Sequence, residues 1–273
     1  MKGKPASYVL GHSKRELERL ATQAGVIDPI TRGFFTEAGI TPGMRVLEVG
    51  SGAGDLALLA ADLVGPTGTI VGVDRVPAAL ATARARAEER GLRHVSFLEG
   101  DLSQVTFERP FDAVVGRYVL MFQQDPGAMV RRLAAHVRPG GVIAFHEPDW
   151  DGAGSFPPAP TYDRCIQWIV ETLRRHGHEA QMGKKLHPTF VAAGLPAPTM
   201  RIGALIGGGE RGVDGLRLIA DLMETMLPAI EGTGVATAAE VGLETLEKRL
   251  LAEAAAQGSV IVGRMEIGAW SRV

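Results

Sequence analysis

The stretch VLEVGSGAGDLALLA, residues 46–60, decides how the rest of the chain is interpreted. An apolar run leads into three closely spaced glycines, and an apolar pattern of helical period leaves them. This order is typical of a buried strand, a tight turn and a helix, with a nucleotide-like ligand held at the turn. The question that the stretch raises is which ligand the turn holds.

The composition indicates an ordinary globular protein. The 273 residues are 45% hydrophobic and 22% charged, which suits one large α/β domain with an insertion. A formal net charge of −2 offers no basic face, so we expect no nucleic-acid partner. The chain shows neither a signal peptide nor an apolar run of membrane-spanning length, so we expect no membrane partner. Cys165 is the only cysteine, which excludes an intrachain disulfide and favours a cytoplasmic location.

Strands and helices alternate through the central part of the chain. Apolar runs typical of strands cover residues 44–50, 69–74, 95–100, 111–117 and 141–147, and helical patterns cover residues 55–65, 77–91 and 126–141. The valine- and isoleucine-rich runs suit a parallel sheet covered on both faces. The pattern predicts a doubly wound α/β fold with its ligand crevice at the carboxyl ends of the strands.

The flanking regions predict further elements. A capping box at Ser13 and Glu16 predicts one short helix, and a second short helix is expected to end near Ala38. Beyond the central part we expect helices over residues 162–176, 213–230 and 238–256, and strands around residues 199–206 and 259–271.

The glycine spacing argues against a phosphate ligand. Gly50, Gly52 and Gly54 read G-x-G-x-G, whereas the dinucleotide fingerprint is G-x-G-x-x-G. Asp55 stands in place of the third glycine, and its charge would repel a pyrophosphate. Glu48 precedes the loop and suits a ligand with an ammonium or sulfonium charge.

Two aspartates complete the candidate binding site. Asp74 ends the second strand, where a carboxylate accepts hydrogen bonds from both ribose hydroxyls. Asp101 follows the third strand, where a carboxylate can accept a hydrogen bond from the exocyclic amine of adenine. Arg75 and Leu102, the next residues along, are assigned to the same site. Together these residues describe adenosine with a short zwitterionic tail.

With these motifs in order, the chain resembles the class I S-adenosylmethionine-dependent methyltransferases over about residues 40–148. The resemblance is closest to the branch that methylates small molecules, including the quinone and natural-product enzymes. It rests on five motifs in the expected order: EVGSGAG, VGVD, EGD, FDAVVGR and RPGGVIAFHE.

The resemblance implies S-adenosyl-L-methionine as cofactor and a Rossmann-like, mostly parallel seven-stranded sheet whose last strand is antiparallel. It also implies N-terminal helices and a helical insertion near the active site. We expect three parts: an N-terminal helical cap over residues 1–40, a core over residues 41–206 and 259–273, and a lid insertion over residues 207–258.

Catalysis in this family is an in-line displacement for which the protein supplies alignment and desolvation. A general base is needed when the acceptor is a protonated hydroxyl, and His146, at the carboxyl end of the fifth strand, is the candidate. Its alternative is a neutral histidine hydrogen-bonded within its loop. Arg117 ends the fourth strand and is assigned to the methionine tail, and Tyr118 beside it to the acceptor. Their alternatives are a salt bridge for Arg117 and a core aromatic for Tyr118.

Four further residues are assigned to acceptor binding. Tyr8 and His12 precede the first helix, which in this branch closes over the site, and simple packing is their alternative. Met223 and Met226 lie at helical spacing within the insertion, where methionine repacks easily around a ligand. Their alternative is an ordinary helix core.

The function expected from the sequence is methyl transfer to an oxygen or carbon of a small, apolar metabolite. A quinone-ring C-methyltransferase is one alternative, since residues 117–126 resemble that group. A cofactor-binding protein of the same fold without turnover is another. No metal is expected, because the acids of residues 146–151 lack the pattern of the metal-dependent O-methyltransferases. A homodimer is compatible with the sequence but not required by it.

Overall fold

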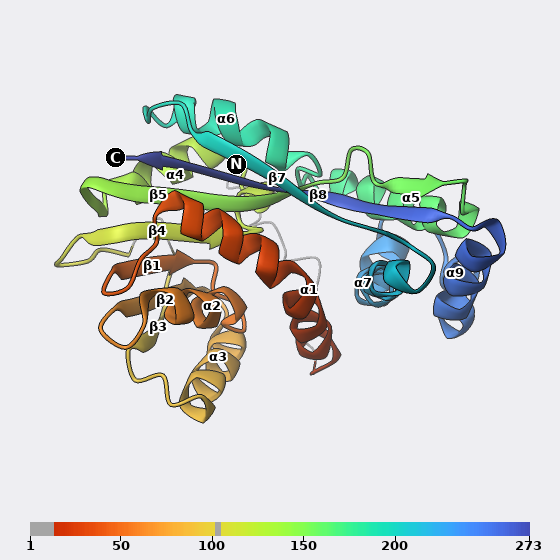
Figure 1. The fold of residues 1–273 in the computed structure, drawn as a ribbon, viewed down its shortest axis with the longest axis horizontal. Coiled ribbons are helices and arrows are strands. Elements are labelled where there is room, and N and C mark those ends of the chain that lie inside the picture. The colour runs from red at the N-terminus through yellow and green to blue at the C-terminus, as the bar shows by residue number, and fades with distance from the viewer. Residues whose placement is uncertain (1–13, 102–104) are drawn as a thin grey trace. The chain divides into compact units, whose positions relative to one another are not determined.

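In the computed structural model of the protein, residues 14–101 and 105–273 are described. Figure 1 shows the chain from its N-terminal helix to its last strand. Four residues singled out from the sequence, Tyr8, His12, Ser13 and Leu102, lie outside the described residues. No described helix combines the length and the apolar composition that crossing a membrane requires.

The chain divides into two compact units. The sheet unit comprises Ile27–Glu147, Met182–Ile202 and Ile267–Val273. The helical unit contains Pro148–Gln181 and Gly203–Glu266, together with the chain up to Val26.

Five parallel strands form the sheet unit's centre. They are β1 (Arg45–Val49), β2 (Thr69–Asp74), β3 (Val95–Glu99), β4 (Phe111–Arg117) and β5 (Val137–Asp149). The strand order is β3-β2-β1-β4-β5-β8-β6, and β7 also pairs with β8. The order reverses between β1 and β4, and the carboxyl ends of these two strands are where a doubly wound fold is expected to bind its ligand.

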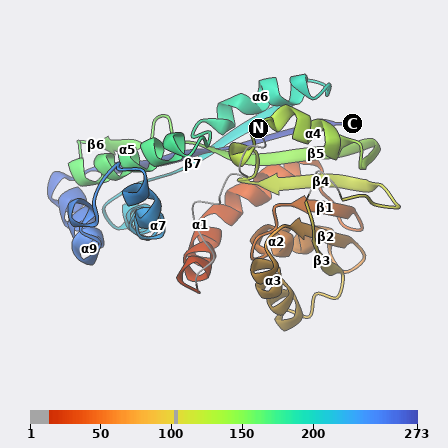
Figure 2. The same cartoon turned by 180° about the vertical axis from the view of Figure 1, so that it is seen from behind.

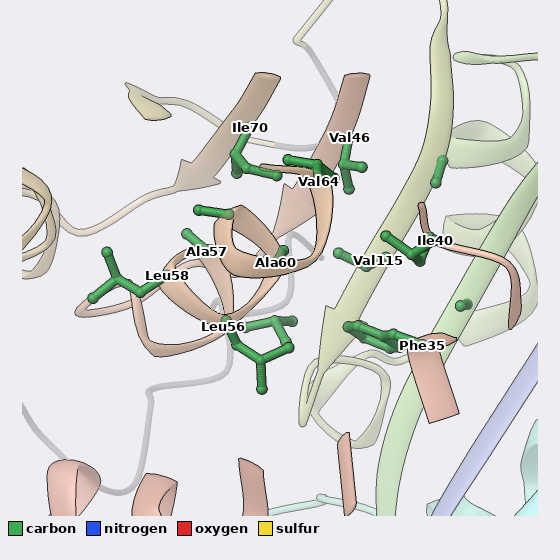
Figure 3. Packing of buried hydrophobic residues seen from close by; sticks show 14 of the residues in the cluster. Phe35, Ile40, Val46, Leu56, Ala57, Leu58, Ala60, Val64, Ile70 and Val115 are labelled. Atoms are coloured by element: carbon green, nitrogen blue, oxygen red, sulfur yellow. The ribbon is translucent and has the colours of Figure 1, made fainter. Parts of the chain in front are cut away.

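Helices cover both faces of these strands. They are α1 (Lys14–Ala38), α2 (Asp55–Val64), α3 (Pro77–Glu89), α4 (Pro126–Ala134) and α6 (Met182–Ala192), with the short 3-10 helix η1 (Leu120–Phe122) after β4. On one face, Phe35 of α1 and Leu56 of α2 belong to the same buried cluster as Val115 of β4 (Figure 3). On the opposite face, the ring of Phe145 in β5 packs edge-on against Phe190 of α6, with centroids 6.4 Å apart.

Three strands follow the parallel set: β6 (Gly154–Phe156), β7 (Thr199–Gly208) and β8 (Val260–Arg272). β8 runs antiparallel to β6, with Ser155 opposite Ile261. The described residues thus form an eight-stranded, mostly parallel sheet, which confirms the predicted fold class and adds one strand to the predicted seven. The added strand is β6, which is only three residues long and lies in a segment predicted as a proline-rich loop.

The helical unit contains α5 (Pro160–Arg175), η2 (Gly209–Gly212), α7 (Val213–Gly232), α8 (Ala238–Val241) and α9 (Leu243–Gln257). Helices α5, α7 and α9 pack against one another, and Figure 2 shows this group from behind. Apolar side chains at helical spacing along α7 are buried, which explains why this segment folds as one long helix.

The helices differ from the sequence prediction at four places. The helix predicted over residues 126–141 ends as α4 at Ala134, and residues 137–141 belong to β5. α1 is one continuous helix through Pro29 rather than two short ones, because its Ile27, Phe34 and Phe35 are buried together. The predicted helix over 238–256 is divided into α8 and α9 at Gly242, whose φ of 59° lies in the left-handed region. α6 was not predicted and has Pro188 in its interior.

Candidate active site

The glycine loop between β1 and α2 is a tight backbone turn. Gly50, Gly52 and Gly54 have φ values of 69°, 50° and 87°, in the region that favours glycine. A Cβ atom at Gly50 would lie 2.7 Å from Val119 Cγ2, and one at Gly54 would lie 3.0 Å from the Ala83 Cβ. At Gly52 nothing lies within 4 Å of that position. The loop is therefore packed against the protein at its first and third glycines and open at its second.

Asp74 holds this loop in place from the end of β2. Its Oδ2 accepts a hydrogen bond from the Gly52 amide at 2.8 Å, and its Oδ1 accepts one from the Val76 amide at 2.9 Å. Each carboxylate oxygen can accept more than one hydrogen bond, so the Asp74 side chain can also accept hydrogen bonds from two neighbouring hydroxyl groups. The structure brings Asp74 to the glycine loop, while Arg75 and Asp101 are exposed beyond the ends of β2 and β3.

Glu48 lies in β1 directly before the loop and is buried. Burial raises the pKa of its carboxyl to about 8, although the Ser51 hydroxyl and the Arg117 guanidinium favour the ionised form. Within the described part of the chain, Glu48 Oε2 has no hydrogen-bond partner. A buried acceptor of this kind fits a ligand that brings a positive charge or hydrogen-bond donors.

Asp55, which was predicted to repel a pyrophosphate, forms an ion pair within the protein. Its Oδ1 lies 2.7 Å from Arg86 Nη2 on α3, and Arg86 Nη1 donates to the carbonyl oxygen of Ala53. The Asp55 charge is compensated by this contact. The argument against phosphates therefore depends on the buried carboxyl of Glu48 rather than on Asp55.

Arg117 and His146 are neighbours at the carboxyl ends of β4 and β5. Arg117 Nη1 donates to Asp28 Oδ1 at 2.7 Å and to Thr31 Oγ1 at 3.0 Å, both on α1. Thr31 Oγ1 also lies 3.0 Å from Nδ1 of His146. A polar network thus joins α1 to the edge of the sheet where the crevice is expected.

The imidazole of His146 is fully buried and lies among aromatic rings. Its ring meets Phe34 edge-on at 5.1 Å and Tyr118 at 5.3 Å between centroids. The structure thus brings His146, Arg117 and Tyr118 together, and their assignment to the donor and the acceptor stays a prediction. An imidazole that is buried and hydrogen-bonded through Nδ1 has a defined orientation, which both a base and a structural histidine need.

Glu147 shapes the segment that follows β4. Its carboxylate accepts hydrogen bonds from the backbone amides of Val119 at 2.8 Å, Leu120 at 2.7 Å and Met121 at 3.3 Å. Tyr118, immediately before them, has a φ of 57°, which is rare for a residue with a side chain. Glu147 therefore anchors the turn over residues 118–121, which contains Val119, the residue against which Gly50 packs.

Sequence reasoning missed Asp28, Thr31 and Glu147. An acid within a continuous buried run was the available signal for Glu147, since a buried charge needs partners. Thr31 and Asp28 lie on a helix far from His146 and Arg117 in the sequence and carry no local motif.

Met223 and Met226 lie on the buried face of α7, with exposed fractions of 0% and 1%. Both belong to the helical unit, whereas the residues of the glycine loop belong to the sheet unit. Their assignment to acceptor binding stays a prediction. Among the described residues, no group of three or more His, Cys, Asp or Glu side chains is arranged to hold a metal ion.

Comparison with known proteins identifies related sequences. A family model described as a methyltransferase domain matches residues 40–194. Aklanonic acid methyltransferase DauC of Streptomyces sp. strain C5 is 34% identical over 158 residues, which cover 58% of this chain and 70% of DauC. Nocamycin O-methyltransferase of Saccharothrix syringae is 31% identical over 196 residues, covering 71% of this chain and 63% of that protein.

Solved structures show the same fold. A methyltransferase from Geobacter sulfurreducens, determined in complex with S-adenosyl-L-homocysteine, superimposes with a TM-score of 0.51 at 22% identity. The superposition covers 88% of this chain and 90% of that one.

Proposed function

The chain belongs to the methyltransferase domain family and uses S-adenosylmethionine as methyl donor, and we propose that it methylates an oxygen or carbon of a small, apolar metabolite. The two relatives described above carry the names of a methyltransferase for aklanonic acid and an O-methyltransferase for nocamycin. The near-neutral chain, with a net charge of −2, gives no electrostatic support for a nucleic-acid acceptor.

The observation that carries the donor site is the combination of the open Gly52, the Asp74 carboxylate bound to its amide, and the buried Glu48. Asp74 would hold the ribose hydroxyls and Glu48 would meet the positive charge of the donor. When bound, S-adenosylmethionine supplies the methyl group from its sulfonium sulfur. The rest of the donor, S-adenosylhomocysteine, then leaves with that sulfur as a neutral thioether.

The residues at the ends of β4 and β5 prepare the acceptor in this proposal. His146 accepts the proton of the acceptor hydroxyl, and burial of its ring keeps water away from the reacting atoms. Arg117, held by Asp28 and Thr31, supplies a positive field beside it. For a carbon acceptor, the same base accepts a proton from the attacked carbon.

We assign the segment over residues 207–258 to a lid above the acceptor. Support comes from its helices α7, α8 and α9 and from the methionines on the buried face of α7, since such a face repacks around apolar ligands. The same proposal keeps residues 1–40 as an N-terminal helical cap, of which residues 1–13 lie outside the described part of the chain.

The experiment uses S-adenosylmethionine with a deuterated methyl group. The purified chain is incubated with this donor and a metabolite extract of the source organism. The products are separated by chromatography and identified by mass spectrometry. The same incubation with Glu48→Gln serves as the control, because that variant keeps the side-chain volume and removes the ionisable carboxyl.

A labelled small molecule formed by the wild type and reduced in the control supports the proposal. Label found only in RNA or protein contradicts the substrate class. Proton NMR of the labelled product separates oxygen from ring-carbon methylation and so tests the quinone alternative. Donor binding with neither label transfer nor S-adenosylhomocysteine release, across extracts that contain apolar hydroxylated metabolites, would show a binding protein without turnover.

A further inference from the structure

The hydroxyl of Thr31 lies at the centre of the polar network between α1 and the sheet. It contacts the Ile27 carbonyl oxygen at 3.3 Å, Arg117 Nη1 at 3.0 Å and His146 Nδ1 at 3.0 Å. Thr31 and His146 are both fully buried. Water therefore does not compete for these contacts, and the roles of donor and acceptor are set by the groups themselves.

A threonine hydroxyl has one proton to donate and two lone pairs to accept with. Arginine has donors only, so Arg117 takes one lone pair of Thr31 Oγ1. The Ile27 carbonyl oxygen is an acceptor only, so it takes the hydroxyl proton. One lone pair remains, and it faces His146 Nδ1.

We propose that Thr31 is a positioning residue that holds His146 in the tautomer with its proton on Nδ1. The opposite assignment would turn the Thr31 proton towards Nδ1 and leave an oxygen lone pair facing the Ile27 carbonyl oxygen. Only the proposed assignment gives each of the three contacts a proton between its heavy atoms. Nε2 then carries the lone pair of the neutral imidazole.

The consequence for the reaction rests on the role proposed above for His146. A base must present an unprotonated nitrogen, and in this tautomer that nitrogen is Nε2. Arg117 contributes by fixing the Thr31 hydroxyl, and the ion pair with Asp28 fixes Arg117 in turn. Helix α1 thereby sets the protonation pattern of a histidine on β5.

The direct test is long-range proton–nitrogen correlation NMR of the imidazoles at about pH 8, where an ordinary histidine is neutral. The chain has seven histidines, and the signals missing in His146→Gln identify His146. Thr31→Val removes the hydroxyl at nearly constant volume, and Thr31→Ser retains it. Thr189→Val is the matched control, because Thr189 is also buried and its hydroxyl bonds only the Lys185 carbonyl oxygen four residues earlier among the contacts described.

The expected wild-type spectrum shows a protonated Nδ1 and an unprotonated Nε2. Thr31→Val shifts His146 towards the other tautomer, while Thr31→Ser and Thr189→Val leave the pattern unchanged. A protonated Nε2 in the wild type, or a pattern that Thr31→Val does not alter, overturns the inference.

Kinetics give a second readout that separates the two proposals. Thr31→Val is expected to lower kcat about tenfold while leaving KM for S-adenosylmethionine within about twofold, and Thr31→Ser restores kcat. A His146→Gln variant with wild-type turnover would refute the base role and leave the tautomer assignment standing, because the spectrum alone decides the assignment.

Discussion

At the scale of single residues, Glu48 is the side chain whose environment is most at odds with stability alone. It is buried next to the glycine loop, and burial raises the pKa of its carboxyl to about 8. Ser51 and Arg117 only partly offset this cost of burial, and a cationic ligand beside the carboxyl would further favour its ionised form.

The first prediction concerns stability without cofactor. The folded pKa of about 8 exceeds the ordinary value of 4.5, so the folded state holds its proton more tightly than the unfolded state. Stability contributed by this group is therefore fully present below about pH 4.5 and is lost as the pH rises towards 8. Glu48→Gln removes that loss and is expected to stabilise the cofactor-free protein by roughly 3 kcal/mol at neutral pH.

Urea unfolding at about pH 5 and about pH 8 measures this difference. The stabilisation by Glu48→Gln should be larger at the higher pH, whereas Glu89→Gln, an exposed carboxyl on α3, should change little at either. An equal effect of Glu48→Gln at both pH values would show that its carboxyl titrates in the ordinary range.

At the scale of elements, the glycine loop is confined by the turn after β4 on one side and by α3 on the other. Gly50→Ala forces a Cβ to within 2.7 Å of Val119 Cγ2 and places alanine at a φ of 69°. The strain and the overlap together are expected to destabilise the protein by about 2–4 kcal/mol in chemical unfolding. Gly52→Ala places alanine at an unfavourable positive φ but creates no overlap, so it should lower the free energy of unfolding by only about 1 kcal/mol.

The overlap has its own test. Adding Val119→Ala to Gly50→Ala removes the colliding methyl groups, so the double variant should be more stable than the sum of the single changes by about 1 kcal/mol. Strict additivity of the two changes would show that the loop and the turn after β4 do not pack as described.

The turn after β4 depends on one buried carboxylate. Glu147→Gln places an NH₂ donor where an oxygen must accept hydrogen bonds from backbone amides. The change is expected to lower the free energy of unfolding by about 3 kcal/mol. Hydrogen exchange at Val119 and Leu120 should accelerate by about 100-fold or more relative to the β1 amides. Asp125→Asn, an exposed cap that accepts the Ala128 amide, should cost no more than about 1 kcal/mol. Unchanged protection at Val119 in Glu147→Gln would contradict the anchoring role.

At the scale of the whole molecule, the parallel strands were predictable because short, largely apolar runs alternate with helical patterns, and the glycine loop because its backbone demands glycine. Elements β6 and α6 were not. β6 is three residues long, too short for periodicity, and α6 contains Pro188, which normally marks a break. In both cases pairing or packing with distant segments decides the structure.

The candidate site follows the same division. Glu48, Asp74 and the three glycines were predictable because they lie within short motifs at strand ends. The contact between Thr31 and His146 joins residues 115 positions apart, and no local pattern encodes it. The left-handed Tyr118 was equally hidden, because Tyr itself does not signal that conformation and the Glu147 carboxylate that supports it lies on another strand.

The central claim is that the glycine loop, with Asp74 beneath it, holds S-adenosylmethionine. Isothermal titration calorimetry of the cofactor into wild type, Asp74→Asn and Asp125→Asn tests it most directly, because both aspartates accept backbone amides and only Asp74 contacts the loop. Wild type and Asp125→Asn should bind alike, and Asp74→Asn should bind about 10- to 100-fold more weakly, as loss of a charged hydrogen bond requires. Equal binding by all three proteins, or no binding by the wild type, would contradict the account.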